Sequence, residues 1–195
     1  MKKTLFGLLA VAFVVFVTSC GKVPQADIDT ANKLIDSVRV IGGDVYLPDQ
    51  FAALQDTMNS INEKVLAQKG KLFRKYDDVK ALLASVSTMG NDLLAATEAK
   101  KIEVKQQVTS LLDELKALID ENQKLVLKAP KGKEGAAAVQ AIKDEITVLE
   151  TTLTEAASLA ESGSLMDAFN KLTAAKEKAV SIQTELKDAI AKVRR

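Results

Sequence analysis

Few residues in this 195-residue chain have side chains suited to covalent or metal chemistry, and the rarest of them is a thiol. Cys20 is the only cysteine, and the chain contains no histidine and no tryptophan. A thiol can act as a nucleophile, ligate a metal or accept a modification, but one cysteine forms no intramolecular disulfide. Without histidine, the chain has no Ser-His-Asp triad, no histidine metal site and no Glu-x-x-His di-iron pair. The chemistry of the sequence therefore centres on Cys20.

The residues before Cys20 have the pattern of an export signal. Lys2 and Lys3 form a positive start, and residues 5–17 form an uncharged apolar run of 13 residues. A bilayer-spanning helix needs about 20 apolar residues, whereas the apolar core of a signal peptide needs only about 7–15. The pattern therefore predicts a signal peptide over residues 1–19 rather than a membrane-spanning helix.

The end of this signal resembles the lipobox of bacterial lipoproteins, reading Val17-Thr18-Ser19-Cys20-Gly21. The resemblance implies that the Cys20 thiol receives a diacylglycerol, that the signal is cut before Cys20 and that the new amine is acylated. Residues 20–24 would then form a lipidated tether. An ordinary signal peptide with an incidental cysteine is the alternative. Because Gly21 rather than an aspartate follows Cys20, the sorting rule of enteric bacteria implies the periplasmic face of the outer membrane rather than the inner membrane.

The chain after the signal is nearly neutral and has the composition of long helices. Of the 27 basic residues two lie in the signal, which leaves 25 basic residues against 26 acidic ones. This even balance argues against a nucleic-acid-binding domain, which usually has a strong basic bias. Alanine, leucine, lysine and glutamate are abundant and the chain has only three prolines, which favours helices.

Apolar residues recur at spacings of three and four along five segments, which predicts an all-α fold of about five helices. The expected helices cover about 24–41, 48–68, 72–128, 134–161 and 164–193, and glycines or the linker 129–133 separate them. The apolar stripe of the long third segment is interrupted near 97–103 and ends with Leu111, Leu115, Leu118 and Leu125. The pattern predicts an elongated antiparallel helical bundle. It would consist of two three-helix bundles, residues 25–100 and 101–195, that share one long central helix.

A short pattern occurs twice, 93 residues apart, where two helical hairpins are expected to turn. In each copy a glycine, Gly70 or Gly163, is followed six residues later by an aromatic, Tyr76 or Phe169. We expect this aromatic to close the end of two antiparallel helices. The five aromatics after the signal are predicted to cap bundles rather than to line a ligand pocket; they are Tyr46, Phe51, Phe73, Tyr76 and Phe169.

The turn between the first two expected helices carries a recognisable pattern, which reads Ile41-Gly42-Gly43-Asp44-Val45-Tyr46-Leu47-Pro48 and continues to Phe51 and Leu54. It resembles a loosely defined group of uncharacterised helical bacterial lipoproteins with the motif A-G-A-x-x-Y-A-P-x-x-L. The resemblance covers about residues 24–100, with Gly43 in place of an alanine and Leu47 in place of a small residue. It implies that a glycine ends the first helix, that Tyr46 packs in a turn over 44–47 and that Pro48 starts the second helix. It implies no reaction.

The remaining polar clusters fit ordinary surface better than a site. Asp77 and Asp78 are adjacent, so on a helix their side chains diverge by about 100°, and we interpret them as first-turn charges. The basic runs Lys100-Lys101 and 128–133 are interpreted as solvated surface, with contact to anionic envelope polymers as the alternative. No P-loop, dinucleotide fingerprint or calcium loop occurs. We therefore expect no catalytic residue, no cofactor and no metal.

These observations favour a non-enzymatic protein of the cell envelope, held to the membrane by lipid on Cys20 and offering its helical faces to a periplasmic protein partner. No nucleic-acid partner is expected. The alternative function is a carrier or sensor that binds an apolar ligand between its helices, for which the small residues Ala136, Ala137 and Ala138 would leave room.

Overall fold

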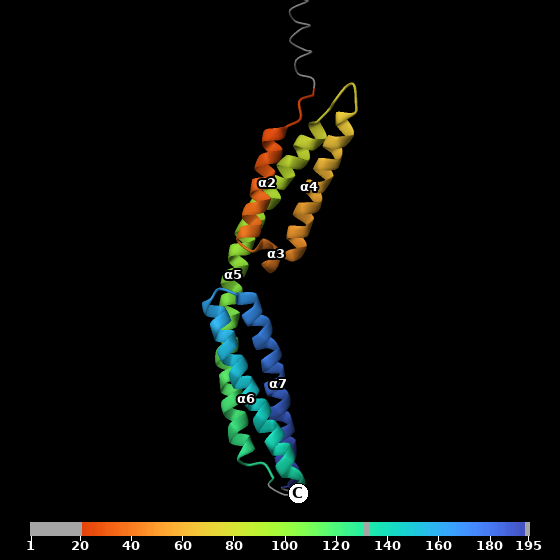
Figure 1. Ribbon diagram of the computed structural model, residues 1–195. Helices are drawn as coiled ribbons and strands as arrows, with labels where there is room; N and C mark the ends of the chain where they lie inside the picture. Colours follow the sequence, from red (N-terminus) through yellow and green to blue (C-terminus); the bar gives the residue numbers. More distant parts are fainter. Residues whose placement is uncertain (1–20, 131–132, 194–195) are drawn as a thin grey trace, which may run out of the picture. The chain divides into compact units, whose positions relative to one another are not determined.

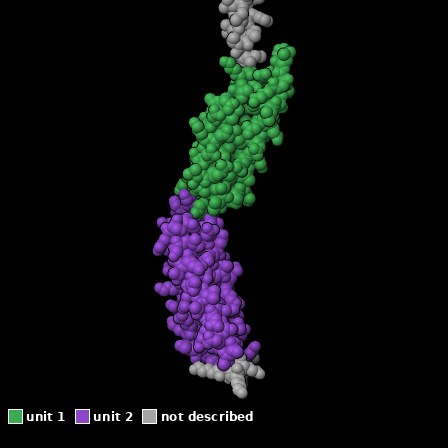
Figure 2. All heavy atoms as spheres, viewed as in Figure 1, with its two compact units in different colours: residues 1–98 green, residues 99–195 purple. Residues whose placement is uncertain are grey.

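A computed structural model describes residues 21–130 and 133–193, so the signal and Cys20 lie outside the described residues. Within these ranges the chain forms six helices and no strand (Figure 1), which confirms the predicted all-α class. The helices are α2 (Gln25–Val40), α3 (Gly43–Tyr46), α4 (Pro48–Lys69), α5 (Asp77–Val126), α6 (Lys133–Glu161) and α7 (Leu165–Val193). The chain divides into two compact units, unit 1 (Met1–Glu98) and unit 2 (Ala99–Arg195), and the residues of α5 are shared between them (Figure 2).

Unit 1 packs α2, α4 and the first part of α5 around one apolar core. The three-and-four spacing predicted for the second helix is confirmed, because its recurring apolar residues are all buried; they are Phe51, Leu54, Met58, Ile61 and Val65. These residues recur every three or four positions, which places them on one face of a 3.6-residue helix. The opposite face carries polar and charged residues, so burial of a single stripe directs how α4 packs.

The connection between α2 and α4 contains a short helix, α3, where a turn over 44–47 was predicted. Gly42 adopts a left-handed conformation with φ of 89°, which glycine tolerates because it has no Cβ. Its carbonyl then accepts hydrogen bonds from the backbone amides of Val45 and Tyr46 at 3.0 and 2.9 Å, and these bonds wind the short helix α3. Pro48 begins α4, as predicted from its fixed φ and missing amide proton.

Gly43 has no room for a side chain, so we expect Gly43→Ala to lower the free energy of unfolding by about 1–3 kcal/mol, the usual cost of overpacking. A Cβ at this buried position would lie 2.4 Å from Cγ1 of Val38 and 3.0 Å from the carbonyl oxygen of Val38. Gly70→Ala is the matched control, because nothing lies within 4 Å of its Cβ position. Thermal unfolding followed by circular dichroism measures both variants. Equal stability of the two would contradict the steric argument.

Unit 2 packs the second part of α5 with α6 and α7. The turn between α6 and α7 is the predicted glycine break. Gly163 has φ of 88°, and the amide of Ser164 donates to the carbonyl of Leu159 at 2.9 Å, a common helix-ending pattern. Ion pairs then join the antiparallel helices, Lys171 to Glu155 at 2.6 Å and Lys178 to Glu145 at 2.7 Å.

Lys176 on α7 also pairs with Glu114 on α5. Hydrogen bonds from Lys176 and from the hydroxyl of Ser110, with the charge of Lys176, lower the pKa of the Glu114 carboxyl. All these partners are exposed, so the ion pairs contribute little to stability. Their arrangement nevertheless shows that α7 contacts both α5 and α6.

The prediction for the long helix was wrong in two respects. Helix α5 begins at Asp77 rather than near residue 72. Its first turn carries two carboxylates, which are stabilised there by the positive end of the helix dipole. The buried stripe beyond Leu115 continues through Ile119, Asn122 and Val126, whereas Leu118 and Leu125 are only half-buried. The stripe was misplaced because the polar Asn122 occupies a core position, which a search for apolar residues passes over.

The helix does continue through 97–103, where the apolar stripe is interrupted. Thr97 is buried in the stripe position of unit 1, and Val104 resumes the stripe in unit 2. The division between the units falls after Glu98. The interruption in the sequence thus coincides with the place where one core ends and the next begins.

The prediction that every aromatic caps a bundle was wrong for Phe73. Phe51 and Tyr76 are buried in unit 1, and Tyr46 is half-buried beside Gly42. Phe169 is half-buried, while its neighbour Ala168 takes the core position. Phe73 instead has 74% of its surface exposed. The repeated pattern therefore has a buried aromatic at Tyr76 and a partly covered one at Phe169, and the glycine is left-handed only at Gly163.

Candidate functional site

The segment after Cys20 is the described part of the chain closest in sequence to the predicted lipidation site. Modification of Cys20 stays a prediction, because this residue lies outside the described residues. Val23 packs against the core of unit 1 and its carbonyl accepts a hydrogen bond from the amide of Gln25 at 2.8 Å. The Pro24 carbonyl accepts from Ile28 at 3.1 Å, so Pro24 precedes α2 rather than forming its first residue. The tether is therefore fastened to unit 1 within three residues of Cys20.

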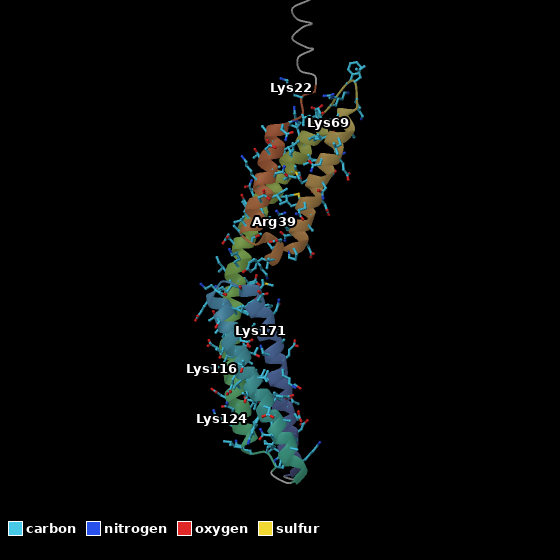
Figure 3. All side chains as sticks on the ribbon, viewed as in Figure 1. Lys22, Arg39, Lys69, Lys116, Lys124 and Lys171 are labelled. Atoms are coloured by element: carbon cyan, nitrogen blue, oxygen red, sulfur yellow. The ribbon has the colours of Figure 1, made fainter. Side chains whose placement is uncertain are left out.

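The tether also contacts the loop that joins α4 to α5. Gly21 has φ of 80°, and a Cβ there would lie 2.8 Å from Cβ of Arg74 and 2.9 Å from its carbonyl oxygen. The start of α2 and the α4–α5 loop lie at the same end of unit 1 (Figure 1). Lys22 on the tether and Lys69 at the end of α4 are both found there (Figure 3). Two segments distant in sequence thus meet beside residue 21.

This end of unit 1 combines exposed apolar and basic side chains. Leu72 and Phe73 have 90% and 74% of their surface exposed, and Leu66 on the last part of α4 has 66%. We call the following set the unit 1 tip: Lys22, Leu66, Lys69, Lys71, Leu72, Phe73, Arg74 and Lys75. Large apolar side chains gathered on a surface commonly mark a contact with another molecule.

The loop of the unit 1 tip is held at both ends by hydrogen bonds to the end of α4. The amide of Lys71 donates to the carbonyl of Gln68 at 3.0 Å, and the amide of Lys75 donates to Oε1 of Gln68 at 3.3 Å. The next residue, Tyr76, is buried in the core. Leu72 and Phe73 are therefore presented between two fixed points, and no signal in the apolar periodicity distinguishes them from core residues.

The structure places the other sequence candidates on ordinary surface. Asp77 and Asp78 are both exposed in the first turn of α5. Lys100 pairs with Glu103 at 2.9 Å, and Lys101 also has an interaction partner. In the second basic run Lys128 is exposed, and residues 131 and 132 lie outside the described residues. Among the described residues no group of acidic, cysteine or histidine side chains is arranged to hold a metal.

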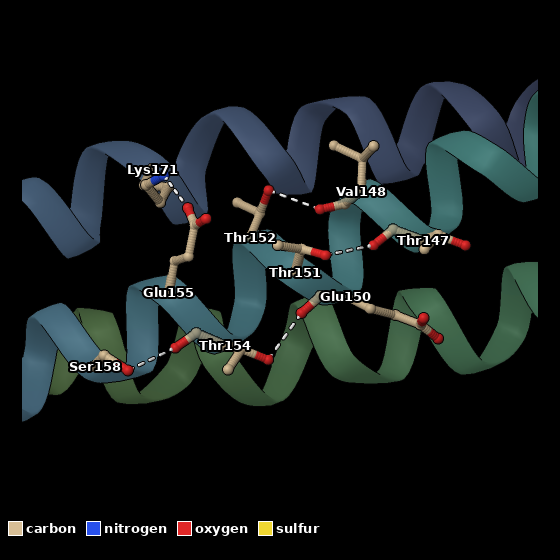
Figure 4. A network of polar contacts seen from close by, with 9 residues as sticks. All are labelled: Thr147, Val148, Glu150, Thr151, Thr152, Thr154, Glu155, Ser158 and Lys171. Carbon is tan, nitrogen blue, oxygen red and sulfur yellow. Dashed lines mark hydrogen bonds and ion pairs between the residues drawn. The ribbon is translucent and has the colours of Figure 1, made fainter.

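A row of hydroxyl groups on α6 was not anticipated from the sequence. Thr147, Thr151, Thr154 and Ser158 are exposed at spacings of four, three and four, and each hydroxyl donates to a carbonyl one turn earlier at 3.0–3.1 Å. Figure 4 shows these bonds for Thr151, Thr154 and Ser158. Part of this row borders a groove of about 590 Å³ that is also lined by Lys171 and Glu155. Because the hydroxyl protons are already used, the polar part of the groove presents acceptors and one ion pair, and Leu159 adds apolar surface.

One side chain in the core of unit 2 is polar. Asn122 is fully buried, its Nδ2 donates to the carbonyl of Ala179 at 2.8 Å, and its Oδ1 has no partner within the described residues. A buried acceptor without a partner costs about 1–3 kcal/mol. Such a residue can be retained because it specifies one register of helix packing.

We expect Asn122→Leu to raise the stability of the protein by about 1 kcal/mol, because it removes the unpaired Oδ1 and keeps a similar volume. The Ala179 carbonyl keeps its own partner within α7. The matched control is Asn91→Leu, at an exposed position of the same helix. Thermal unfolding should show an increase in Tm of about 2–4 °C for Asn122→Leu alone. A lower Tm would mean that the bond to Ala179 outweighs the unpaired oxygen.

Comparisons of the chain with protein-family models, with curated proteins and with solved structures find no match. None of the helices in the described part of the chain is long and apolar enough to cross a bilayer.

Proposed function

We propose that this chain is a lipid-anchored periplasmic lipoprotein whose helical bundles act as a non-enzymatic structural or protein-interaction module of the cell envelope. The proposal places the anchor on Cys20 and the protein on the periplasmic face of the outer membrane. The single observation that carries it is the lipobox pattern at 17–21 followed directly by a helical unit.

The short tether supports this proposal. Only residues 21–24 separate Cys20 from α2, and Val23 already packs on the core of unit 1. Lipid on Cys20 would hold unit 1 next to the membrane surface, since four extended residues span at most about 14 Å. A module held in this way meets envelope proteins that share its membrane without a long search through the periplasm.

The surface of unit 2 supports a protein partner better than an apolar ligand. Ala136, Ala137 and Ala138, which would have left room for a ligand between helices, are all exposed. The groove beside α6 is lined by hydroxyl-bearing residues, by the ion pair of Glu155 and Lys171 and by Leu159. The exposure of these three alanines therefore removes the sequence argument for the carrier or sensor alternative.

The proposal is tested by crosslinking intact cells and purifying the full-length protein with whatever is attached to it. The matched control is Cys20→Ala expressed at the same level. We expect a reproducible set of envelope proteins with the wild-type chain and loss of that set with the variant. The same set with both chains would mean that lipid on Cys20 is not needed for these interactions, and no reproducible set with either would contradict the interaction role.

A further inference from the structure

We propose that the unit 1 tip is a second membrane contact, which docks on the anionic headgroups of the bilayer that holds the Cys20 lipid. This inference rests on the proposed anchor and deepens it. The anchor alone would leave the protein free to tilt and rotate about its tether. A docked tip would fix which end and which side of unit 1 face the membrane.

The first argument is position. Gly21 immediately follows the proposed lipid-bearing residue, and its backbone lies against Arg74 in the α4–α5 loop. Lipid on Cys20 would therefore enter the bilayer next to Gly21, the residue that contacts Arg74 of the tip. The loop lies at this end of unit 1 together with the start of α2 (Figure 1). No hinge or extension is needed to bring the tip to the membrane surface.

The second argument is the apolar side chains. Leu72 and Phe73 are adjacent at the turn of the loop and are the most exposed apolar pair in the described part of unit 1. Side chains of this kind are stabilised at the boundary between headgroups and acyl chains. In water they would remain exposed, because Tyr76 already fills the nearby core position.

The third argument is charge. No acidic residue occurs between 64 and 76, and the tip carries five cations. Within the described residues none of these five side chains forms a salt bridge, whereas Lys171, Lys176 and Lys178 in unit 2 all pair with glutamates. A cation close to an anionic bilayer strengthens partitioning about fivefold. A tip with basic side chains around an apolar pair should therefore bind a bilayer with anionic headgroups more strongly than a bilayer with neutral headgroups.

The test uses the absence of tryptophan from the chain. Phe73→Trp puts a single fluorophore, the tip probe, at an exposed position that should accept it without loss of folding. The full-length lipidated protein is placed in vesicles that contain phosphatidylglycerol, with or without bromine on the acyl chains. Bromine quenches tryptophan only within the bilayer. The matched control is Val40→Trp, the control probe, at a position with 86% of its surface exposed at the other end of the 16-residue helix α2, about 24 Å away.

We expect the emission of the tip probe to shift to shorter wavelength and to lose at least half its intensity with brominated lipid, while the emission of the control probe changes little. In vesicles of neutral phosphatidylcholine the quenching of the tip probe should be at least twofold weaker. Adding Lys71→Gln and Lys75→Gln to the Phe73→Trp chain should weaken the quenching in anionic vesicles to a similar degree.

Flotation of the vesicles separates failure of the tip from failure of the anchor. Protein that floats with the vesicles while the tip probe stays unshifted and unquenched would overturn the docked tip and leave the anchor intact. A tip probe with shifted but unquenched emission would mean that a protein, such as a second copy of this chain, covers the tip, which also overturns the inference. A purified chain that carries no lipid and does not float with the vesicles would contradict the proposed anchor, and the docked tip would be overturned with it.

Discussion

Replacing Cys20 with alanine is expected to abolish incorporation of fatty acid into the protein and to leave the signal attached. The thiol is the only group in the chain that can form a thioether with a diacylglycerol, and the resemblance to lipoproteins makes this modification precede cleavage. The variant chain should therefore retain residues 1–19, whereas the wild-type chain should begin at a lipid-bearing Cys20. The expected change in labelling is from full incorporation to background.

Labelling cells with an alkyne fatty acid and measuring the intact mass of the purified protein checks both expectations. Ser19→Ala is the matched control, since it keeps a small residue before the cysteine and should keep the label. Each buried CH₂ group contributes about 0.8 kcal/mol to membrane binding, and more than one chain is needed for stable anchoring. The wild-type mass should therefore show two or three acyl chains. A wild-type protein with a free thiol and no label would contradict the lipobox interpretation.

Replacing Leu172 with alanine is expected to lower the free energy of unfolding of unit 2 by about 2–5 kcal/mol. The Leu172 side chain on α7 is fully buried, with 0% of its surface exposed. Truncation loses the burial of its outer carbons and leaves a cavity, because neighbouring side chains relax only partly. Since whole domains are typically stable by only about 5–15 kcal/mol, the change should be large enough to populate the unfolded form of this unit.

Hydrogen exchange measured by mass spectrometry reports this loss directly on the amides of α6 and α7. A chain with two compact units need not unfold in one step, so a local measurement is more informative than a single melting curve. Leu127→Ala is the matched control, because Leu127 is 76% exposed and surface substitutions usually change stability by less than about 0.5 kcal/mol. Similar exchange in the two variants would mean that Leu172 is not a core residue.

Helix positions were predictable wherever a local signal and the burial pattern agreed. Pro48 starts α4 because its ring fixes φ at a helical value. Gly163 forms the turn after α6 because glycine, which has no Cβ, tolerates a positive φ. The apolar stripe of α4 was predicted in full because its positions carry no competing polar residue. Signals of this kind depend only on neighbours along the chain.

The candidate site was only partly predictable. The lipobox pattern at Cys20 is contiguous, so it is recognisable without any structure. The unit 1 tip is not contiguous, because it exists only where the tether at Gly21 meets the loop at Arg74. Leu72 and Phe73 satisfy the same periodicity as core residues, and only the start of α5 at Asp77 leaves them outside a helix.

Local signals in the sequence were enough to predict the all-α class, most helix boundaries, the buried stripe of α4 and the one residue with a proposed covalent role. These follow from backbone preferences and from the 3.6-residue period, which act locally. Packing between helices determines which of two adjacent stripes the end of α5 buries, where Thr97 and Asn122 enter the cores and which apolar side chains remain uncovered. Those outcomes depend on what lies across from each position, because a side chain is buried only when another helix covers it.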